Sequence, residues 1–88
     1  MSIADDLRQR LATLAPSQLD IRDDSARHAG HAGAKSGGHY AISIVSPRFA
    51  GLSGMQRHRL VYDAAGDLMQ RGIHALSIAA KTPAEARP

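Results

Sequence analysis

The residues in this sequence with the chemistry to bind a metal ion are its histidines. The 88-residue chain holds five His and no Cys. Imidazole nitrogen is a ligand that zinc accepts, and His28, His31, His39 and His74 are four candidate donors. Their spacing fixes no coordination geometry, and histidines gathered in a loop are common. The pattern alone therefore indicates nitrogen donors without defining a zinc site.

The absence of cysteine excludes several kinds of chemistry. A chain without thiols forms no disulfide, no thiolate zinc site and no Cys nucleophile, and it cannot hold an iron–sulfur cluster with sulfur ligands of its own. The sequence also contains no credible Ser-His-Asp arrangement, paired buried carboxylates, phosphate-binding loop or metalloprotease motif. We therefore predict a protein that is not an enzyme.

A second candidate site combines glycines with positive charge. Gly51 and Gly54 form a G-x-x-G between two predicted helical segments, the place where a KH domain clamps a nucleic-acid backbone. Arg57, His58 and Arg59 follow and indicate an anionic partner, such as a glutathione carboxylate, an acidic patch or phosphate. The plainer interpretation is a turn before a solvated helix start. The net charge of +3 permits nucleic-acid binding without requiring it, and the lack of an aromatic stacking platform predicts weak, salt-sensitive binding.

A short series of elements must position these residues. Apolar residues recur at helical spacing over residues 3–14 and 55–71, and they alternate with other residues over 19–24, 40–46 and 73–80. Phe49 and Leu52 indicate a short helical turn, and one more turn is predicted after Thr82 in the polar tail 81–88. Residues 26–38 are rich in glycine, which favours a loop, and a loop of this length is typically functional or disordered.

The order of these elements predicts one α+β domain spanning residues 1–88. A crossover through helices makes the second and third strands parallel, which gives a three-stranded mixed sheet with helices on one face. The result is a two-layer αββααβα sandwich of the type II KH-like topology. No apolar run approaches the ~20 residues that cross a membrane, and the N-terminus is acidic, so we expect a cytoplasmic protein without membrane contact.

Four segments together resemble the BolA family. They are Asp23-Asp24-Ser25 before the His-bearing loop; His39-Tyr40 with the strand 42–46, then Phe49 and Gly51; residues 56–62, QRHRLVY; and residues 73–78, IHALSI, followed by Thr82-Pro83-Ala84-Glu85. The similarity runs in order through nearly the whole chain. Its most specific parts are the Arg-His-Arg helix start and the His-Ala-Leu strand at this separation. The resemblance implies the same αββααβα fold.

The resemblance also implies a function. Members of the BolA family pair with monothiol glutaredoxins and share a [2Fe–2S] cluster in iron–sulfur trafficking, and some members are DNA-binding transcriptional regulators. By position, the cluster ligands on this side are His74 and His28, with His31 as the alternative loop ligand. The partner supplies sulfur from its active-site Cys and its bound glutathione, so no cofactor is expected in the isolated chain, a monomer or weak homodimer. The alternative function is DNA binding through Gly51, Gly54, Arg57, His58 and Arg59.

His74 has a plainer interpretation from spacing alone. It alternates with Leu76 and Ile78, which predicts a side chain on their helix-facing side, at the rim of the core and hydrogen-bonded to backbone. The resemblance shifts the preference to a ligand. His39 opens the second strand, and we predict that it points away from the face of Tyr40 and has a structural or surface role. Because a metal binds neutral imidazole, ligation is expected to weaken below pH ~6.5.

Overall fold

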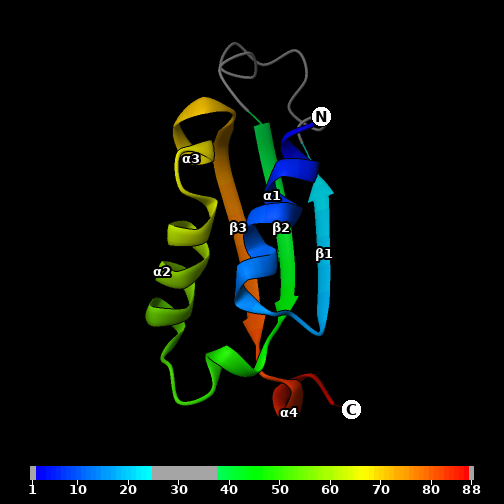
Figure 1. Ribbon diagram of the computed structural model, residues 1–88, viewed down its shortest axis with the longest axis vertical. Coiled ribbons are helices and arrows are strands. Elements are labelled where there is room, and N and C mark those ends of the chain that lie inside the picture. The colour runs from blue at the N-terminus through cyan, green and yellow to red at the C-terminus, as the bar shows by residue number, and fades with distance from the viewer. Residues whose placement is uncertain (1, 25–37, 88) are drawn as a thin grey trace.

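The computed structural model describes residues 2–24 and 38–87 (Figure 1). The elements along the chain are α1 (Ile3–Leu11), η1 (Ala12–Leu14), β1 (Gln18–Asp23), β2 (Gly38–Val45), η4 (Pro47–Phe49), α2 (Gly54–Ala65), α3 (Leu68–Arg71), β3 (Ile73–Lys81) and α4 (Pro83–Ala86), where η marks a short 3-10 helix. His28, His31 and most of the predicted loop lie outside the described residues. No helix in the described ranges has the length and apolar character to span a membrane.

The three strands form one mixed sheet in the order β1-β2-β3. β1 and β2 are antiparallel, with Leu19 opposite Ile44, and β2 and β3 are parallel, with Ile42 opposite Ile78. The α+β fold predicted from the sequence is thereby confirmed. In Figure 1, β3 runs from the end of the molecule near the N-terminus to the end near α4, so its first and last residues belong to opposite ends of the sheet.

Helix starts follow local sequence signals. Ser2 caps α1, because its hydroxyl oxygen accepts a hydrogen bond from the backbone N–H of Asp5 at 3.1 Å, and the Asp5 carboxylate accepts one from the Ser2 N–H in return. Thr82 caps α4 in the same way, with Glu85 as the reciprocal acceptor. The helical turn predicted after Thr82 is therefore present.

The helix predicted over residues 55–71 is instead two helices. α2 ends at Ala65, and α3 begins only at Leu68. Gly66 separates them with φ +57° and ψ −130°, a conformation that is accessible mainly to glycine. Arg10 from α1 secures the break, because its guanidinium donates to the Ala65 carbonyl oxygen at 3.0 Å. Apolar spacing alone does not register such a break.

One hydrophobic core joins the helices to one face of the sheet. Leu7 and Leu11 of α1 pack with Val61 of α2 and Ile44 of β2, and all four are completely shielded from solvent. Burying each leucine contributes about 1.5–3 kcal/mol relative to exposure. The other face of the sheet bears a shallow groove of about 590 Å³ instead. Six of its lining residues come from alternate strand positions: Asp20, Arg22, Ala41, Ser43, Ser77 and Ala79.

Candidate functional site

His74 lies at an irregularity in the sheet. Gly38 pairs with Ile73, but the next residue of β2, His39, pairs with Ala75, so His74 is an extra residue in β3. A bulge of this kind changes the direction of the side chain that it carries. Ile73 is buried in the core and His74 is exposed. The prediction that His74 shares the helix-facing side of Leu76 was therefore wrong, because the bulge interrupts the alternation before Leu76.

The same bulge brings a second imidazole to His74. The ring centroids of His39 and His74 are 5.2 Å apart, and the two ring planes are inclined by 49°. His39 is half-buried and lies on β2 beside the bulge. Its sequence neighbour Tyr40 is buried in the core, as expected for alternating faces. Residues that are 35 positions apart in the sequence thus form one pair of nitrogen donors at the end of the sheet.

The predicted loop ligands lie outside the part of the chain that the structure describes. His28 and His31 fall in the segment 25–37, outside the described residues, so their part in the site stays a prediction. Within residues 2–24 and 38–87, no group of three or more His, Cys, Asp or Glu side chains is arranged to hold a metal ion. Among the described residues, the two imidazoles of His39 and His74 lie side by side.

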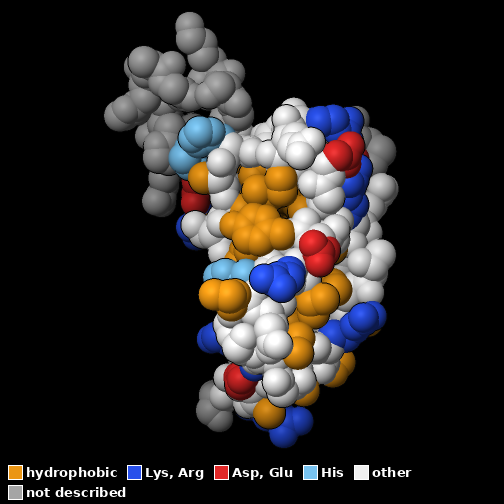
Figure 2. Space-filling view, turned by 90° about the vertical axis from the view of Figure 1, so that its left-hand side faces the viewer, with side chains coloured by type: hydrophobic (Ala, Val, Ile, Leu, Met, Phe, Trp, Pro, Cys, Tyr) orange, Lys and Arg blue, Asp and Glu red, His pale blue; other side chains and the backbone are white. Residues whose placement is uncertain are grey.

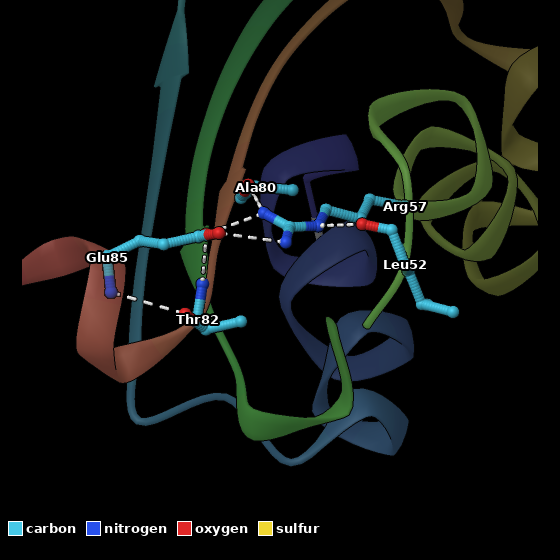
Figure 3. Close-up of polar contacts among 5 residues, drawn as sticks. All are labelled: Leu52, Arg57, Ala80, Thr82 and Glu85. Atoms are coloured by element: carbon cyan, nitrogen blue, oxygen red, sulfur yellow. Dashed lines mark hydrogen bonds and ion pairs between the residues drawn. The ribbon is translucent and has the colours of Figure 1, made fainter. Parts of the chain in front are cut away.

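Arg57 is engaged inside the chain (Figure 3). Its guanidinium donates to the carbonyl oxygens of Leu52 at 3.0 Å and Ala80 at 3.1 Å, and it forms a two-pronged ion pair with Glu85 at 2.6 and 3.0 Å. The side chain is only 14% exposed. Arg57 therefore fastens α4 and the end of β3 to α2, and we do not count it among the residues that present charge to a partner.

Glu85 is the acidic half of this clamp. The pKa of its carboxyl group is lowered from 4.5 to about 2, chiefly by the hydrogen bond from Arg57 and then by the backbone N–H of Thr82. The pKa of Arg57 is raised, mainly by the hydrogen bond to Glu85. Both groups are therefore charged at neutral pH, and the clamp is closed under ordinary conditions.

The G-x-x-G lies at the start of α2. Gly51 has φ +77°, which favours glycine, and Gly54 is the first residue of the helix. No heavy atom outside the local backbone lies within 4 Å of the position that a Cβ at Gly54 would take. His58 and Arg59 are exposed nearby on α2. These residues keep the exposure that the sequence analysis predicted for an anion-binding surface, whereas Arg57 does not.

α2 also exposes apolar side chains that sequence patterning missed. Met55 is 75% exposed and Tyr62 is 40% exposed. Figure 2 shows the side of the molecule formed by α2 and α3, where hydrophobic side chains are interleaved with Lys or Arg side chains and His. Met55, Arg59 and Tyr62 share one helix face by their spacing of four and three residues. Spacing from the buried Val61 would have marked Tyr62 as outward-facing.

The two candidate surfaces lie at opposite ends of the sheet. Arg57 binds the carbonyl oxygen of Ala80 near the end of β3, whereas His74 is at its start. Ala80 is six positions beyond His74 in β3, a distance of about 20 Å at about 3.3 Å per residue. The imidazole pair and the Arg57 clamp therefore cannot contact the same small group. A small ligand bound by His74 therefore does not reach the end of the sheet that carries the G-x-x-G.

The fold and the site together define a small α+β domain with two neighbouring imidazoles at one end of a sheet that helices cover on one face. The model of the BolA-like protein family matches residues 11–85 of this chain. The chain belongs to the BolA-like protein family.

Similar proteins agree with this assignment. The chain is 45% identical over 74 residues to BolA-like protein 1 of Mus musculus. This match covers 84% of this chain and 53% of that protein. It is 44% identical over 86 residues to SufE-like protein 1, chloroplastic/mitochondrial, of Arabidopsis thaliana, covering 90% of this chain and 23% of that protein. The chain thus spans about half of the first relative's length and under a quarter of the second's.

Solved structures share the fold over nearly the whole chain. BolA1 from Arabidopsis thaliana matches with a TM-score of 0.84 and 38% identity, covering 99% of both chains. The BolA domain of SufE1 from Arabidopsis thaliana matches with a TM-score of 0.85 and 44% identity, covering 98% of both chains. The arrangement of this sheet and its helices is therefore that of known BolA domains.

Proposed function

We propose that this chain is a non-catalytic adaptor that binds a monothiol glutaredoxin and co-ligates a [2Fe–2S] cluster, for cluster assembly, cluster transfer or iron sensing. The observation that carries the proposal is the exposure of His74, the position that the family resemblance assigns to a ligand. An imidazole at the rim of the core would be hidden from a partner, whereas His74 is accessible at the end of the sheet. The occurrence of a BolA domain within SufE1 of Arabidopsis thaliana, where it is one part of a longer protein, supports a domain that works together with other domains.

The ligand chemistry fits a shared cluster. Two imidazoles can replace two thiolates on one iron of a [2Fe–2S] cluster, and this chain has nitrogen donors but no cysteine. The partner then supplies sulfur from its active-site Cys and from bound glutathione. His74 is the first ligand in this proposal, and His28, with His31 as its alternative, is the loop ligand implied by the family. The cytoplasmic location stays a prediction, because similar plant proteins are described as chloroplastic or mitochondrial.

Mixing the chain with a cluster-loaded monothiol glutaredoxin tests this function. We expect a heterocomplex whose visible absorption and circular dichroism differ from those of the glutaredoxin alone. His74→Ala should return the spectrum of the glutaredoxin alone, whereas the control Ser77→Ala, at an exposed residue of the same strand β3, should leave the heterocomplex spectrum intact. An unchanged spectrum with His74→Ala would show that His74 is not a ligand.

A second candidate function is DNA binding through the start of α2. It is favoured by the open backbone at Gly54 together with the exposed His58 and Arg59. Such binding would be directed at the phosphate backbone, and its affinity would fall steeply with salt. Gly54→Asp should abolish it, because a carboxylate would stand where a phosphate approaches, while Arg71→Gln on α3 serves as the control. Equal duplex affinity of the Gly54→Asp variant and the unaltered chain would reject this surface.

A further inference from the structure

The geometry of the His39–His74 pair matches that of two imidazoles bound to one metal ion. With a zinc–nitrogen distance of about 2.0–2.1 Å, a ring centre lies about 3.2 Å from the metal, and a tetrahedral angle of about 109° then places two ring centres about 5.2 Å apart. The observed separation of the centroids is 5.2 Å. Ring centroids in ordinary aromatic contacts also lie about 4.5–7 Å apart, so this separation is compatible with a shared metal ion without requiring one.

Both rings stand on the framework of the sheet. His39 of β2 is paired with Ala75 of β3. Its backbone carbonyl oxygen also accepts a hydrogen bond from the N–H of Asp24 at 2.7 Å. His74 is held by the bulge between Ile73 and Ala75, both of which are paired with β2. Ligands on strands are positioned more precisely than ligands on loops. Both candidate ligands are therefore positioned by paired strands.

We propose that His39 and His74 form a two-nitrogen metal site that binds a divalent transition-metal ion such as Zn²⁺ in the free chain. Resting on the proposed function, the same two nitrogens ligate one iron of the shared cluster, so His39, and not His28 or His31, is the second ligand. Two protein ligands leave the remaining positions to another molecule, unlike a structural zinc site, which has four protein ligands. This incompleteness is what a shared site requires.

Zn²⁺ titration of the free chain, followed by the imidazole ring resonances in NMR spectra, tests the site itself. We expect the signals of His39 and His74 to shift together and to saturate at one Zn²⁺ per chain, while those of His58 stay in place. His39→Ala and His74→Ala should each weaken Zn²⁺ binding by about 100-fold, because the second imidazole binds intramolecularly once the first is engaged. The double variant should bind Zn²⁺ no more tightly than either single one.

Two outcomes would overturn the proposal of a metal site at His39 and His74. One is Zn²⁺ that shifts His28 or His31 while His39 and His74 remain unmoved. The other is a His39→Ala variant with the Zn²⁺ affinity of the unaltered chain. The joint shift of two rings is measured on the unaltered chain, so a variant that fails to fold does not obscure the answer.

The glutaredoxin heterocomplex then tests the role of His39 in cluster binding. A His28→Ala/His31→Ala double variant should keep the heterocomplex spectrum, and His39→Ala should lose it. The reverse pattern would return the second ligand to the loop. If no heterocomplex forms with the unaltered chain, the proposed adaptor function fails, while the Zn²⁺ titration still decides whether the pair is a metal site.

Discussion

Ser46 is a completely buried hydroxyl that ties three segments together, and its removal should be costly. The Ser46 Oγ–H donates to the carbonyl oxygen of Leu14 at 2.6 Å, and the same oxygen accepts from the backbone N–H of Arg48 at 3.1 Å. Ser46→Ala removes both hydrogen bonds. Leaving a buried polar group unpaired costs about 1–3 kcal/mol, and the lost cap of η4 adds to this, so we expect a total loss of about 2 kcal/mol.

Urea unfolding followed by circular dichroism measures this loss. The midpoint should fall at an unchanged dependence on urea, and the melting temperature should drop by about 8–16 °C, at about 4–8 °C per kcal/mol for a domain of this size. Ser43→Ala is the matched control, because Ser43 is an exposed residue of the preceding strand β2 and its loss should change stability by less than about 0.5 kcal/mol. Equal stability of the two variants would refute the assignment of Ser46 as a structural hydroxyl.

Two further predictions concern the helix break and the Arg57 clamp. Gly66→Ala should destabilise the chain by about 1–3 kcal/mol in urea unfolding, because φ is +57° and the new Cβ would lie 3.0 Å from the Arg10 guanidinium; stability equal to that of the unaltered chain would contradict the strain. Glu85 has a pKa lowered to about 2, so its stabilisation is complete above its unfolded pKa near 4.5 and is lost as the pH falls toward 2. The difference in melting temperature between the unaltered chain and Glu85→Gln should therefore shrink from pH 6 to pH 2.5, and a constant difference would exclude the ion pair as its source.

Local patterns predicted most of the fold. The caps at Ser2 and Thr82 are recognisable from neighbouring residues, and the three strands follow from alternating apolar positions, because each signal depends on residues close together in the chain. The break at Gly66 has no comparable local signal. The apolar stripe continues across it, and the contact from Arg10 that secures it comes from another helix.

The site was harder to predict, because its geometry depends on distant pairings. The direction of His74 is set by a one-residue shift in the pairing of β2 with β3, and a shift of one residue reverses the face of a side chain. His39 was assigned a structural or surface role for the same reason. Arg57 was grouped with an anion-binding run, although its partners Ala80 and Glu85 are 23 and 28 residues away in sequence. His58 and Arg59 are exposed, as the plainer interpretation of a solvated helix start predicted.

The separation of the two ends of the sheet gives the molecule two independently testable surfaces. The imidazole pair stands at the start of β3, and the G-x-x-G and the Arg57–Glu85 clamp stand about 20 Å away at its end. Substitutions at one end should therefore leave binding at the other unchanged, as expected for sites this far apart with no shared contacts.

The most direct test of the account is to count the nitrogen ligands of the shared cluster. The chain would be labelled with ¹⁵N-histidine, combined with an unlabelled cluster-loaded monothiol glutaredoxin, reduced, and studied by pulsed electron paramagnetic resonance. The account predicts strong couplings to two ¹⁵N nuclei, each removed by substitution of its own histidine, His39 or His74. A reduced cluster in the heterocomplex with no strong coupling to labelled nitrogen would contradict the claim that this chain ligates iron through imidazole.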